Sequence, residues 1–335
     1  MTTRLVPDVP TDPAFHAVVA RLQQASRIVV SSHEKPDGDA IGSGMALTLA
    51  LRALGKDARM VMCDAPPAYL RPFPAVDGLW IARDVTDTFD AAAIMECSDL
   101  SRTGVAGLDR SPVLNVDHHP GNARYGIVNW VDESAAACGE LVYALIQALG
   151  APFTADIATH VYLAILTDTG SFHFSHLSPR TFDVAARCVE AGADPVAIAR
   201  THYDSNRMAR VRLFGSVLSG MVVEPSGRAA ALTLTQAMAT AADGSYDDTE
   251  GLINFPLSVK EVEAVAFFKE DAGPDRWRLS LRSKGPVDVG AIAMVLGGGG
   301  HRNAAACRLT GPIDRLRQDV LDALTRAIEA ASRQP

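Results

Sequence analysis

The sequence has few cysteines, and none of them lies in a paired or metal-binding pattern. The five are Cys63, Cys97, Cys138, Cys188 and Cys307. They are odd in number, widely spaced and form no CxxC motif. Such a set argues against a disulfide framework and against a zinc ribbon, and it favours a reducing compartment.

The chain also lacks an excess of positive charge and a long apolar run. Lys and Arg total 31 against 39 Asp and Glu, which gives a formal net charge of −8. That charge provides no broad electrostatic attraction to a long nucleic acid, so we expect only short or small anionic partners. No apolar stretch approaches membrane length, and residues 1–15 contain no apolar signal core. These absences predict a soluble, cytoplasmic protein that does not bind membranes.

Apolar residues are abundant, at 48% of a 335-residue chain that is long enough for two ordinary domains. Expected strands lie at 28–30, 56–63, 91–95 and 112–116, and expected helices at 12–26, 41–51, 138–149 and 154–166. Strands that alternate with helices predict an α/β fold with a doubly wound, mainly parallel sheet, which we assign to residues 1–194.

The remainder of the chain has a different pattern. We expect a helical connector at 195–224, with one helix over 196–219, followed by a smaller α+β domain at 225–335. In that domain the pattern alternates from 228 to 238, which is typical of a strand. Further strands are expected at 262–269 and 277–282, and helices at 289–296 and 313–331.

A polar cluster follows the first expected strand. His33, Asp37 and Asp39 form the pattern H-x3-D-x-D, and one imidazole with two carboxylates is a mixed ligand set for a divalent cation. A strand-to-helix loop of an open α/β sheet lies at the carboxyl edge, where ligands bind. For Asp39 taken alone, a helix N-cap is the simpler interpretation.

Two further clusters point to the same edge. Asp117, His118 and His119 follow the strand at 112–116, where one imidazole can bind a metal while the other faces a substrate. Asp117 can orient an imidazole through its ring N–H. The alternative is a polar strand end with one hydrogen-bonded histidine. Asp168 ends an apolar helix, where it either closes a turn or completes the carboxylate cluster.

Glu96 and Asp99 compete for one role. A two-metal site needs a carboxylate that touches both cations. Glu96 directly follows the strand at 91–95, whereas Asp99 is placed to cap the next turn. We therefore predict Glu96 as the shared ligand.

The second domain contains a glycine run followed by a histidine, at residues 297–301. Glycines there permit close approach to a ligand or a positive φ, and their N–H groups suit a phosphate or carboxylate. A flexible loop is the alternative. Arg282 and Ser283 end an expected strand and offer donors for a phosphate. We predict that these two residues bind substrate together with Gly298, Gly299, Gly300 and His301. His173 and His176 are weaker candidates for which structural roles are favoured.

Taken together, these motifs resemble the DHH phosphoesterases with a C-terminal DHHA1 domain, in particular the branch of nanoRNases and pAp phosphatases. The resemblance covers nearly the whole chain and includes the segments TDTG at 167–170 and GGGGH at 297–301. Two positions depart from the family pattern: Glu96 stands where Asp is usual, and Ala306 where a glycine usually follows the paired alanines.

The resemblance implies a centre of two divalent cations, usually manganese, with magnesium or cobalt as alternatives. His33 and Asp37 match the ligands of one cation, and Asp39, His118 and Asp168 match those of the other. Glu96 occupies the bridging position. His119 matches the residue that contacts the scissile phosphate, and Asp117 is counted with it among the catalytic residues.

The expected activity is hydrolysis of short oligoribonucleotides, linear dinucleotides, 3'-phosphoadenosine 5'-phosphate (pAp), or a combination of these. A cyclic-dinucleotide phosphodiesterase and a non-catalytic nucleotide sensor on the same fold are the alternatives. The GGGGH segment disfavours an inorganic pyrophosphatase, since it resembles a nucleotide-binding element. A homodimer is compatible with the sequence.

Overall fold

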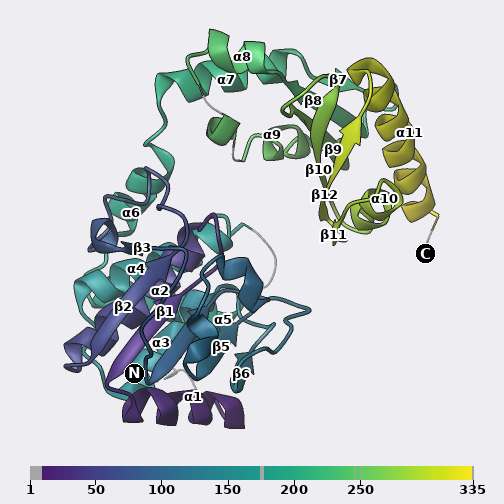
Figure 1. The fold of residues 1–335 in the computed structure, drawn as a ribbon. Coiled ribbons are helices and arrows are strands. Elements are labelled where there is room, and N and C mark those ends of the chain that lie inside the picture. Colours follow the sequence, from purple (N-terminus) through teal and green to yellow (C-terminus); the bar gives the residue numbers. More distant parts are fainter. Residues whose placement is uncertain (1–9, 174–176, 245, 250, 334–335) are drawn as a thin grey trace. The chain divides into compact units, whose positions relative to one another are not determined.

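The computed structural model describes residues 10–173, 177–244, 246–249 and 251–333. The chain divides into two compact units, Met1–Ser205 and Asn206–Pro335, each built around its own six-stranded sheet (Figure 1). The predicted domain limits near 194 and 224 stay a prediction. No helix of the described ranges is long and apolar enough to cross a membrane.

The first unit has a parallel sheet in the order β3-β2-β1-β4-β5-β6, which confirms the predicted α/β class. Its strands are β1 (Arg27–Ser31), β2 (Asp57–Met62), β3 (Trp80–Ile81), β4 (Ala91–Met95), β5 (Val113–Asp117) and β6 (Val128–Val131). Its helices are α1 (Pro13–Gln24), α2 (Gly38–Ala53), α3 (Cys138–Leu149), α4 (Ala155–Asp168), α5 (Pro179–Glu190) and α6 (Pro195–Tyr203). The short 3₁₀ turns are η1 (Val76–Gly78), η2 (Leu100–Thr103) and η3 (Leu108–Arg110).

The central strands are buried on both faces, which explains their continuous apolar runs. Ile28 and Val30 of β1 pack into the core formed with the α-helices, while Val29 packs into a separate core with Val85 and Phe89. Because the strands are parallel, the loops after β1, β4 and β5 all leave from the same edge of the sheet. Three of the predicted polar clusters are therefore brought to one edge.

The packing of helix α2 against α4 brings Asp168, at the end of α4, to the other candidate ligands. A Cβ atom at Gly42 of α2 would lie only 2.6 Å from the carbonyl oxygen of His160 in α4, so glycine permits this close approach. Asp37 caps α2 by accepting the amide of Ala40 at 3.0 Å. The start of α2 and the end of α4, which carries Asp168, are thus held together.

The second unit has the strand order β11-β12-β10-β9-β8-β7, antiparallel except for the pair β8 and β9. Its strands are β7 (Val222–Val223), β8 (Ala229–Leu234), β9 (Ala264–Glu270), β10 (Arg276–Ser283), β11 (Gly299–His301) and β12 (Ala304–Thr310). Its helices are α7 (Met208–Ser219), α8 (Gln236–Ala241), α9 (Asn254–Leu257), α10 (Val289–Val295) and α11 (Ile313–Ala331), with the 3₁₀ turn η4 (Tyr246–Thr249).

Two expectations for the later part of the chain are wrong. The single helix over 196–219 is interrupted at 204–207, because Asp204, Ser205 and Asn206 are poor helix formers. The alternation at 228–238 ends as a strand at Leu234, and Thr235 then caps α8. The glycine run and the alanines after it form a hairpin of β11 and β12, and not the flexible loop that was the alternative.

Candidate metal centre

His118 lies at the centre of the polar cluster in the first unit. Its Nε2 atom is 3.2 Å from Glu96 Oε2, 3.5 Å from Asp168 Oδ2 and 3.9 Å from Asp39 Oδ2. Two groups of residues each bring three ligand atoms within 4.8 Å of one another. One group is Asp39, His118 and Asp168, and the other is Glu96, His118 and His119. The structure therefore brings the clusters after β1, β4, β5 and α4 together, as predicted.

His33 and Asp37 form a second group, with 3.8 Å between His33 Nε2 and Asp37 Oδ1. Burial by itself lowers the pKa of His33, but the hydrogen bond and charge of Asp37 raise it overall, and the charge of Glu96 adds to the rise. Glu96 likewise raises the pKa of His118. The carboxylate of Glu96 thus acts on both groups.

Both candidate histidine ligands use Nδ1 to bind a backbone carbonyl. The distance is 2.8 Å from His33 Nδ1 to the oxygen of Glu34, and 3.0 Å from His118 Nδ1 to the oxygen of Ala135. A carbonyl only accepts, so each Nδ1 donates a proton to it, and Nε2 is the ring atom that a cation could bind in place of a proton. Metal-binding histidines are commonly oriented in this way.

The buried polar atoms of the cluster fit a bound cation. Glu96 Oε2 and His118 Nε2 are buried and have no hydrogen-bond partner among the described residues, although they lie 3.2 Å apart. An unpaired buried group costs about 1–3 kcal/mol. A divalent cation would satisfy both atoms, and the mixed nitrogen and oxygen set suits a metal such as manganese.

The carboxylates of the cluster also repel one another. Burial, followed by the charges of Glu96 and Asp168, raises the pKa of Asp39 well above its usual value. Burial and the charge of Glu96 raise the pKa of Asp168 to about 6. Although burial lowers the pKa of His118, Glu96 and the other two carboxylates raise it to about 11. The site thus concentrates negative charge that a cation would neutralise.

Glu96 reaches this cluster through an unusual backbone conformation. Its φ is +54°, in the left-handed region, while its amide still donates to the oxygen of Val116 at 3.0 Å. A non-glycine residue in that region costs of order 1–3 kcal/mol, and such strain is concentrated at functional sites. The side chain is thereby placed 3.2 Å from His118 and 3.4 Å from His119 Nδ1.

Asp99, the competitor for the bridging role, has a different function in the structure. Its Oδ1 atom accepts the amide of Ser101 at 2.8 Å and the hydroxyl of Ser101 at 2.6 Å, so it caps η2. The hydrogen bonds with Ser101 lower the pKa of this carboxylate. Asp99 therefore acts in the local turn, and Glu96 is the residue that faces the cluster.

Asp39 is held by the start of α3, which the sequence analysis missed. The amides of Cys138 and Gly139 donate to its two carboxylate oxygens at 2.6 Å and 3.1 Å. A Cβ at Gly139 would lie 2.6 Å from the Cβ of Ala164 in α4, so glycine is needed for the close approach of α3 to α4. Gly139 was the one available signal, because backbone donors leave no other trace in a sequence.

Asp117 orients His119, as the sequence suggested. Its Oδ1 atom lies 2.9 Å from His119 Nδ1 and also accepts the amides of His118 and His119. The hydrogen bond that His119 donates to Asp117 is the largest cause of the raised pKa of His119. His119 Nε2 is consequently the ring atom that remains for a substrate.

Comparison with known proteins agrees with this architecture. Residues 27–165 match the DHH family, N-terminal domain, and residues 233–333 match the DHHA1 domain. The bifunctional oligoribonuclease and PAP phosphatase NrnA of Thermus thermophilus is 35% identical over 306 residues, which span 91% of each chain. The chain belongs to the DHH family.

Other relatives extend over most of this DHH protein. The bifunctional oligoribonuclease and PAP phosphatase NrnA of Bacillus subtilis is 26% identical over 84% of this chain and 89% of its own. A crystal structure of an exopolyphosphatase-related protein from Bacteroides fragilis has a TM-score of 0.89 at 25% identity, covering 98% of this chain and 100% of the other. RecJ of Thermus thermophilus, solved with Mn²⁺, shares the fold at a TM-score of 0.53 and 16% identity, over 98% of this chain and 56% of RecJ.

The glycine run lies in the DHHA1 domain, and its glycines differ in why they are needed. A Cβ at Gly298 would collide with the backbone oxygen of Ala306, which lies within β12. Gly300 has φ +140°, and its Cβ would lie 2.5 Å from the oxygen of Ala304. Gly299 is exposed and has nothing within 4 Å of such a Cβ. The hairpin itself therefore requires Gly298 and Gly300 but not Gly299.

Arg282 and Ser283 lie at the end of β10 in the same domain. The hydroxyl of Ser283 is buried, donates to the oxygen of Val287 at 2.7 Å and accepts Nδ2 of Asn303 at 2.9 Å. Arg282 is half-buried, which lowers its pKa, and its Nη1 donates to the oxygen of Leu281 at 3.2 Å. His301 belongs to β11 by its backbone. Substrate binding by these residues stays a prediction.

Of the two weaker histidine candidates, only His173 lies among the described residues, and it is not part of the ligand groups found there. His173 is exposed, and its amide donates to the oxygen of Thr169 at 2.9 Å. His176 lies outside the described residues. Neither residue gains support as a ligand.

A further group of metal-type ligands is found in the DHH unit. The ligand atoms of Glu34, Cys63 and Asp64 are within 4.8 Å of one another. Asp64 already accepts the amide of Lys35 at 3.0 Å and pairs with Arg83 at 3.3 Å. Burial raises the pKa of the Cys63 thiol, which disfavours the thiolate that a metal would need. This group is a weaker metal site than the one around His118.

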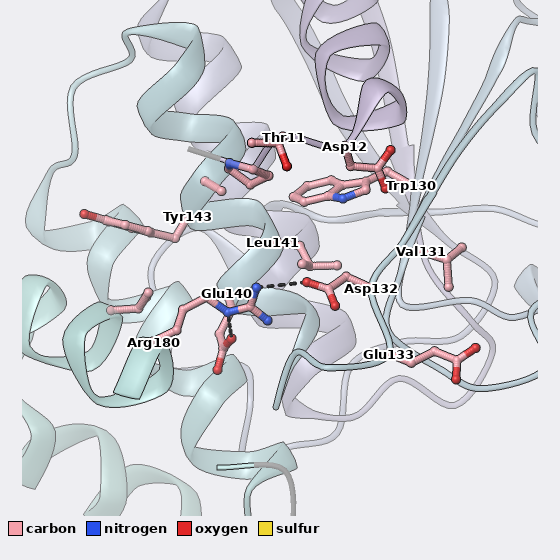
Figure 2. A pocket seen from close by; sticks show the side chains of 13 residues that line it. Thr11, Asp12, Trp130, Val131, Asp132, Glu133, Glu140, Leu141, Tyr143 and Arg180 are labelled. Carbon is pink, nitrogen blue, oxygen red and sulfur yellow. Dashed lines mark hydrogen bonds and ion pairs between the residues drawn. The ribbon is translucent and has the colours of Figure 1, made fainter. Parts of the chain in front are cut away.

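A pocket of about 500 Å³ also lies in the DHH unit, but none of the candidate ligands lines it (Figure 2). Figure 2 shows Arg180 reaching between two carboxylates, with 2.6 Å from its Nε to Glu140 Oε2 and 2.9 Å from its Nη1 to Asp132 Oδ2. These ion pairs join α5 to α3 and to the residues after β6. We attribute them to packing between elements.

Proposed function

We propose that this protein is a metal-dependent phosphoesterase that hydrolyses short oligoribonucleotides and pAp with two divalent cations, manganese foremost. The observation that carries the proposal is that the buried atoms Glu96 Oε2 and His118 Nε2 have no hydrogen-bond partner in the described part of the chain. The carboxylates of Asp39 and Asp168 also lie 3.9 Å and 3.5 Å from His118 Nε2. The names of the relatives from Thermus thermophilus and Bacillus subtilis support the substrate class.

The ligands divide into two groups that share one carboxylate. His33 and Asp37 would hold one cation, and the group of Asp39, His118 and Asp168 would hold the other, with Glu96 shared. When bound, the two cations would polarise the phosphoryl group and lower the pKa of an attacking water. The two separate contact groups, each influenced by the charge of Glu96, support this division.

His119 would act on the phosphate. Its Nδ1–H bonds to Asp117, so Nε2 is the ring nitrogen that is free to face a substrate. A proton on Nε2 can be donated to a phosphoryl oxygen or to the leaving oxygen. The buried carboxylate of Asp117 stabilises the ring in the charged form that this donation requires.

The DHHA1 unit would select the substrate. We propose that the backbone at Gly299, together with Arg282 and His301, contacts a terminal phosphate or base of a short nucleotide. A net charge of −8 supports a preference for short substrates, because the chain has no excess of cations to follow a long backbone.

A substrate panel tests the proposal. With Mn²⁺ present, pAp and 5'-phosphorylated RNA of two to about five nucleotides should be hydrolysed fastest, and kcat/KM should fall for longer RNA. Linear pApA and pGpG should be substrates, whereas the cyclic dinucleotides should not. Turnover restricted to cyclic dinucleotides would show the cyclic-dinucleotide alternative instead, and binding of pAp without turnover would show a sensor.

A further inference from the structure

Asp117 is a fully buried carboxylate whose two oxygens have different partners. Oδ1 accepts the ring N–H of His119 at 2.9 Å, and Oδ2 accepts Nδ2 of Asn122 at 2.6 Å. Burial tends to raise the pKa of Asp117, but these hydrogen bonds lower it overall. Asn122 therefore contacts the residue that orients His119, from the side opposite to the imidazole.

The surroundings of Asn122 permit only one orientation of its amide. Its Nδ2 also donates to the oxygen of Cys97 at 3.3 Å, and its Oδ1 accepts Nδ2 of Asn115 and the amide of Arg124, each at 2.7 Å. A side-chain amide has one acceptor atom and one donor atom. A flipped amide would place its oxygen against the carboxylate of Asp117 and its NH₂ group against two donors.

Asn115 anchors this arrangement in the sheet. It is fully buried in β5, two residues before Asp117, so both side chains lie on the same face of the strand. Its Nδ2 donates a second bond, at 3.2 Å, to Oδ1 of Asn129. Asn129 is fixed in turn by the backbone of Gly126, through bonds of 2.8 Å and 2.7 Å. The side-chain amides of Asn129, Asn115 and Asn122 are thus joined by hydrogen bonds from the paired strands β5 and β6 to Asp117.

We propose that Asn122 is a positioning residue for the reaction. Through Asp117 it holds the imidazole of His119 in the rotation that directs Nε2 toward the phosphate. Without Asn122, Oδ2 of Asp117 is left buried and unpaired, and the carboxylate is free to turn away from the imidazole. This inference rests on the proposed function for its kinetic consequence, but not for the arrangement of the ring.

The kinetic test compares Asn122→Ala with the unchanged protein, both loaded with Mn²⁺ and assayed on pAp. We expect kcat to fall about 10- to 100-fold, the usual effect of removing a group that orients a metal-site or catalytic side chain. KM and the bound manganese per chain should change less than about twofold, because Asn122 contacts no candidate ligand. Asn129→Ala is the matched control, since it removes an amide two hydrogen bonds farther from Asp117, and kcat should fall less than about threefold.

A second measurement follows the ring itself. In Mg²⁺-loaded protein labelled with ¹⁵N-histidine, the Nδ1–H proton of His119 should give a downfield, slowly exchanging NMR signal. Asn122→Ala should shift this signal upfield or broaden it, while the signals of His33 and His118 stay in place. Asn122→Leu keeps roughly the size of the side chain and removes the donor without adding a charge beside Asp117, so it gives the same test if the alanine variant does not fold.

Two results would overturn the inference. One is an unchanged His119 signal together with unchanged kcat in both Asn122 variants. The other is a loss of manganese, or of thermal stability, in proportion to the loss of activity, which would make Asn122 a structural residue only. If the unchanged protein hydrolyses neither pAp nor short RNA, the proposed function fails, while the NMR measurement still decides the role of Asn122.

Discussion

Two buried carboxylates of the DHH unit and the glycines of the DHHA1 hairpin differ sharply in their exposure to solvent. In the DHH unit, Asp39 and Glu96 are 1% and 2% exposed, and each is held by backbone amides or by a strained turn. In the DHHA1 unit, Gly299 and Gly300 lie exposed on a hairpin. Buried carboxylates are costly unless a permanent partner neutralises them, whereas exposed backbone N–H groups are satisfied by water until a ligand replaces it. The difference fits the metal centre that we propose in the first unit and the substrate-binding surface that we propose in the second.

Removing metal tests the first half of this comparison and should have the largest effect. Treatment with a chelator should abolish hydrolysis of every substrate, because the clustered carboxylates and His118 would lose the cations that we propose they bind. Adding back Mn²⁺ should restore the rate and raise the thermal unfolding temperature. When free Mn²⁺ is in hundredfold excess over its Kd, its binding should add about 2.7 kcal/mol to the free energy of unfolding. Persistent hydrolysis by metal-free protein would contradict the assignment of the centre.

A matched pair of carboxylate variants tests which residue is shared. Glu96→Gln should lower kcat about a hundredfold and reduce the bound metal, since one lost charge weakens both groups of ligands. Asp99→Asn should stay within about threefold of the unchanged protein, because Asp99 only caps η2. Metal analysis and kinetics on both variants decide this, and the reverse result would reassign the bridge to Asp99.

If the DHHA1 unit binds the nucleotide, a variant in that unit should affect some substrates more than others. His301→Ala should lower kcat/KM for pAp about 10- to 100-fold, the loss expected for one charge-assisted hydrogen bond of ~1.5–3 kcal/mol. A small chromogenic phosphodiester that does not reach the DHHA1 unit should be hydrolysed almost as before. If both substrates lose activity equally, or metal is lost, His301 belongs to the catalytic centre or to the fold.

Two neighbouring glycines sharpen the comparison further. Gly299→Ala should leave the unfolding temperature unchanged, because the hairpin has space for the new Cβ, but it should lower kcat/KM for pAp about tenfold if a ligand approaches there. Gly298→Ala should lower the unfolding temperature, because its Cβ collides with β12. Normal hydrolysis of pAp by the stable Gly299→Ala protein would remove this glycine from the predicted binding site.

The DHH unit could be predicted well from the sequence because its signals are local. Continuous apolar runs mark β1, β4 and β5, and parallel strands necessarily place the residues that follow them at one edge. The convergence of Asp39, Glu96 and His118 follows from that rule. The α/β fold class was predicted correctly from the alternation of strands with helices, and the family from short motifs that are continuous in the sequence.

The parts that were missed depend on contacts between distant residues. β12 pairs with β10, and its alanines and the glycines of β11 carry no alternating apolar pattern. The amides that hold Asp39 come from residues about 100 positions later, and a backbone amide leaves no mark in a sequence. Asn122 was overlooked because a single loop asparagine is more often a turn residue than a partner of a buried carboxylate.

Anomalous diffraction at the manganese edge, from crystals grown with Mn²⁺, tests the central claim most directly. We predict two peaks about 3.5–4 Å apart in the DHH unit, both in contact with the carboxylate of Glu96. One peak should also contact His33 and Asp37, and the other Asp39, His118 and Asp168. A single peak, or peaks only at Glu34, Cys63 and Asp64, would contradict the two-cation centre.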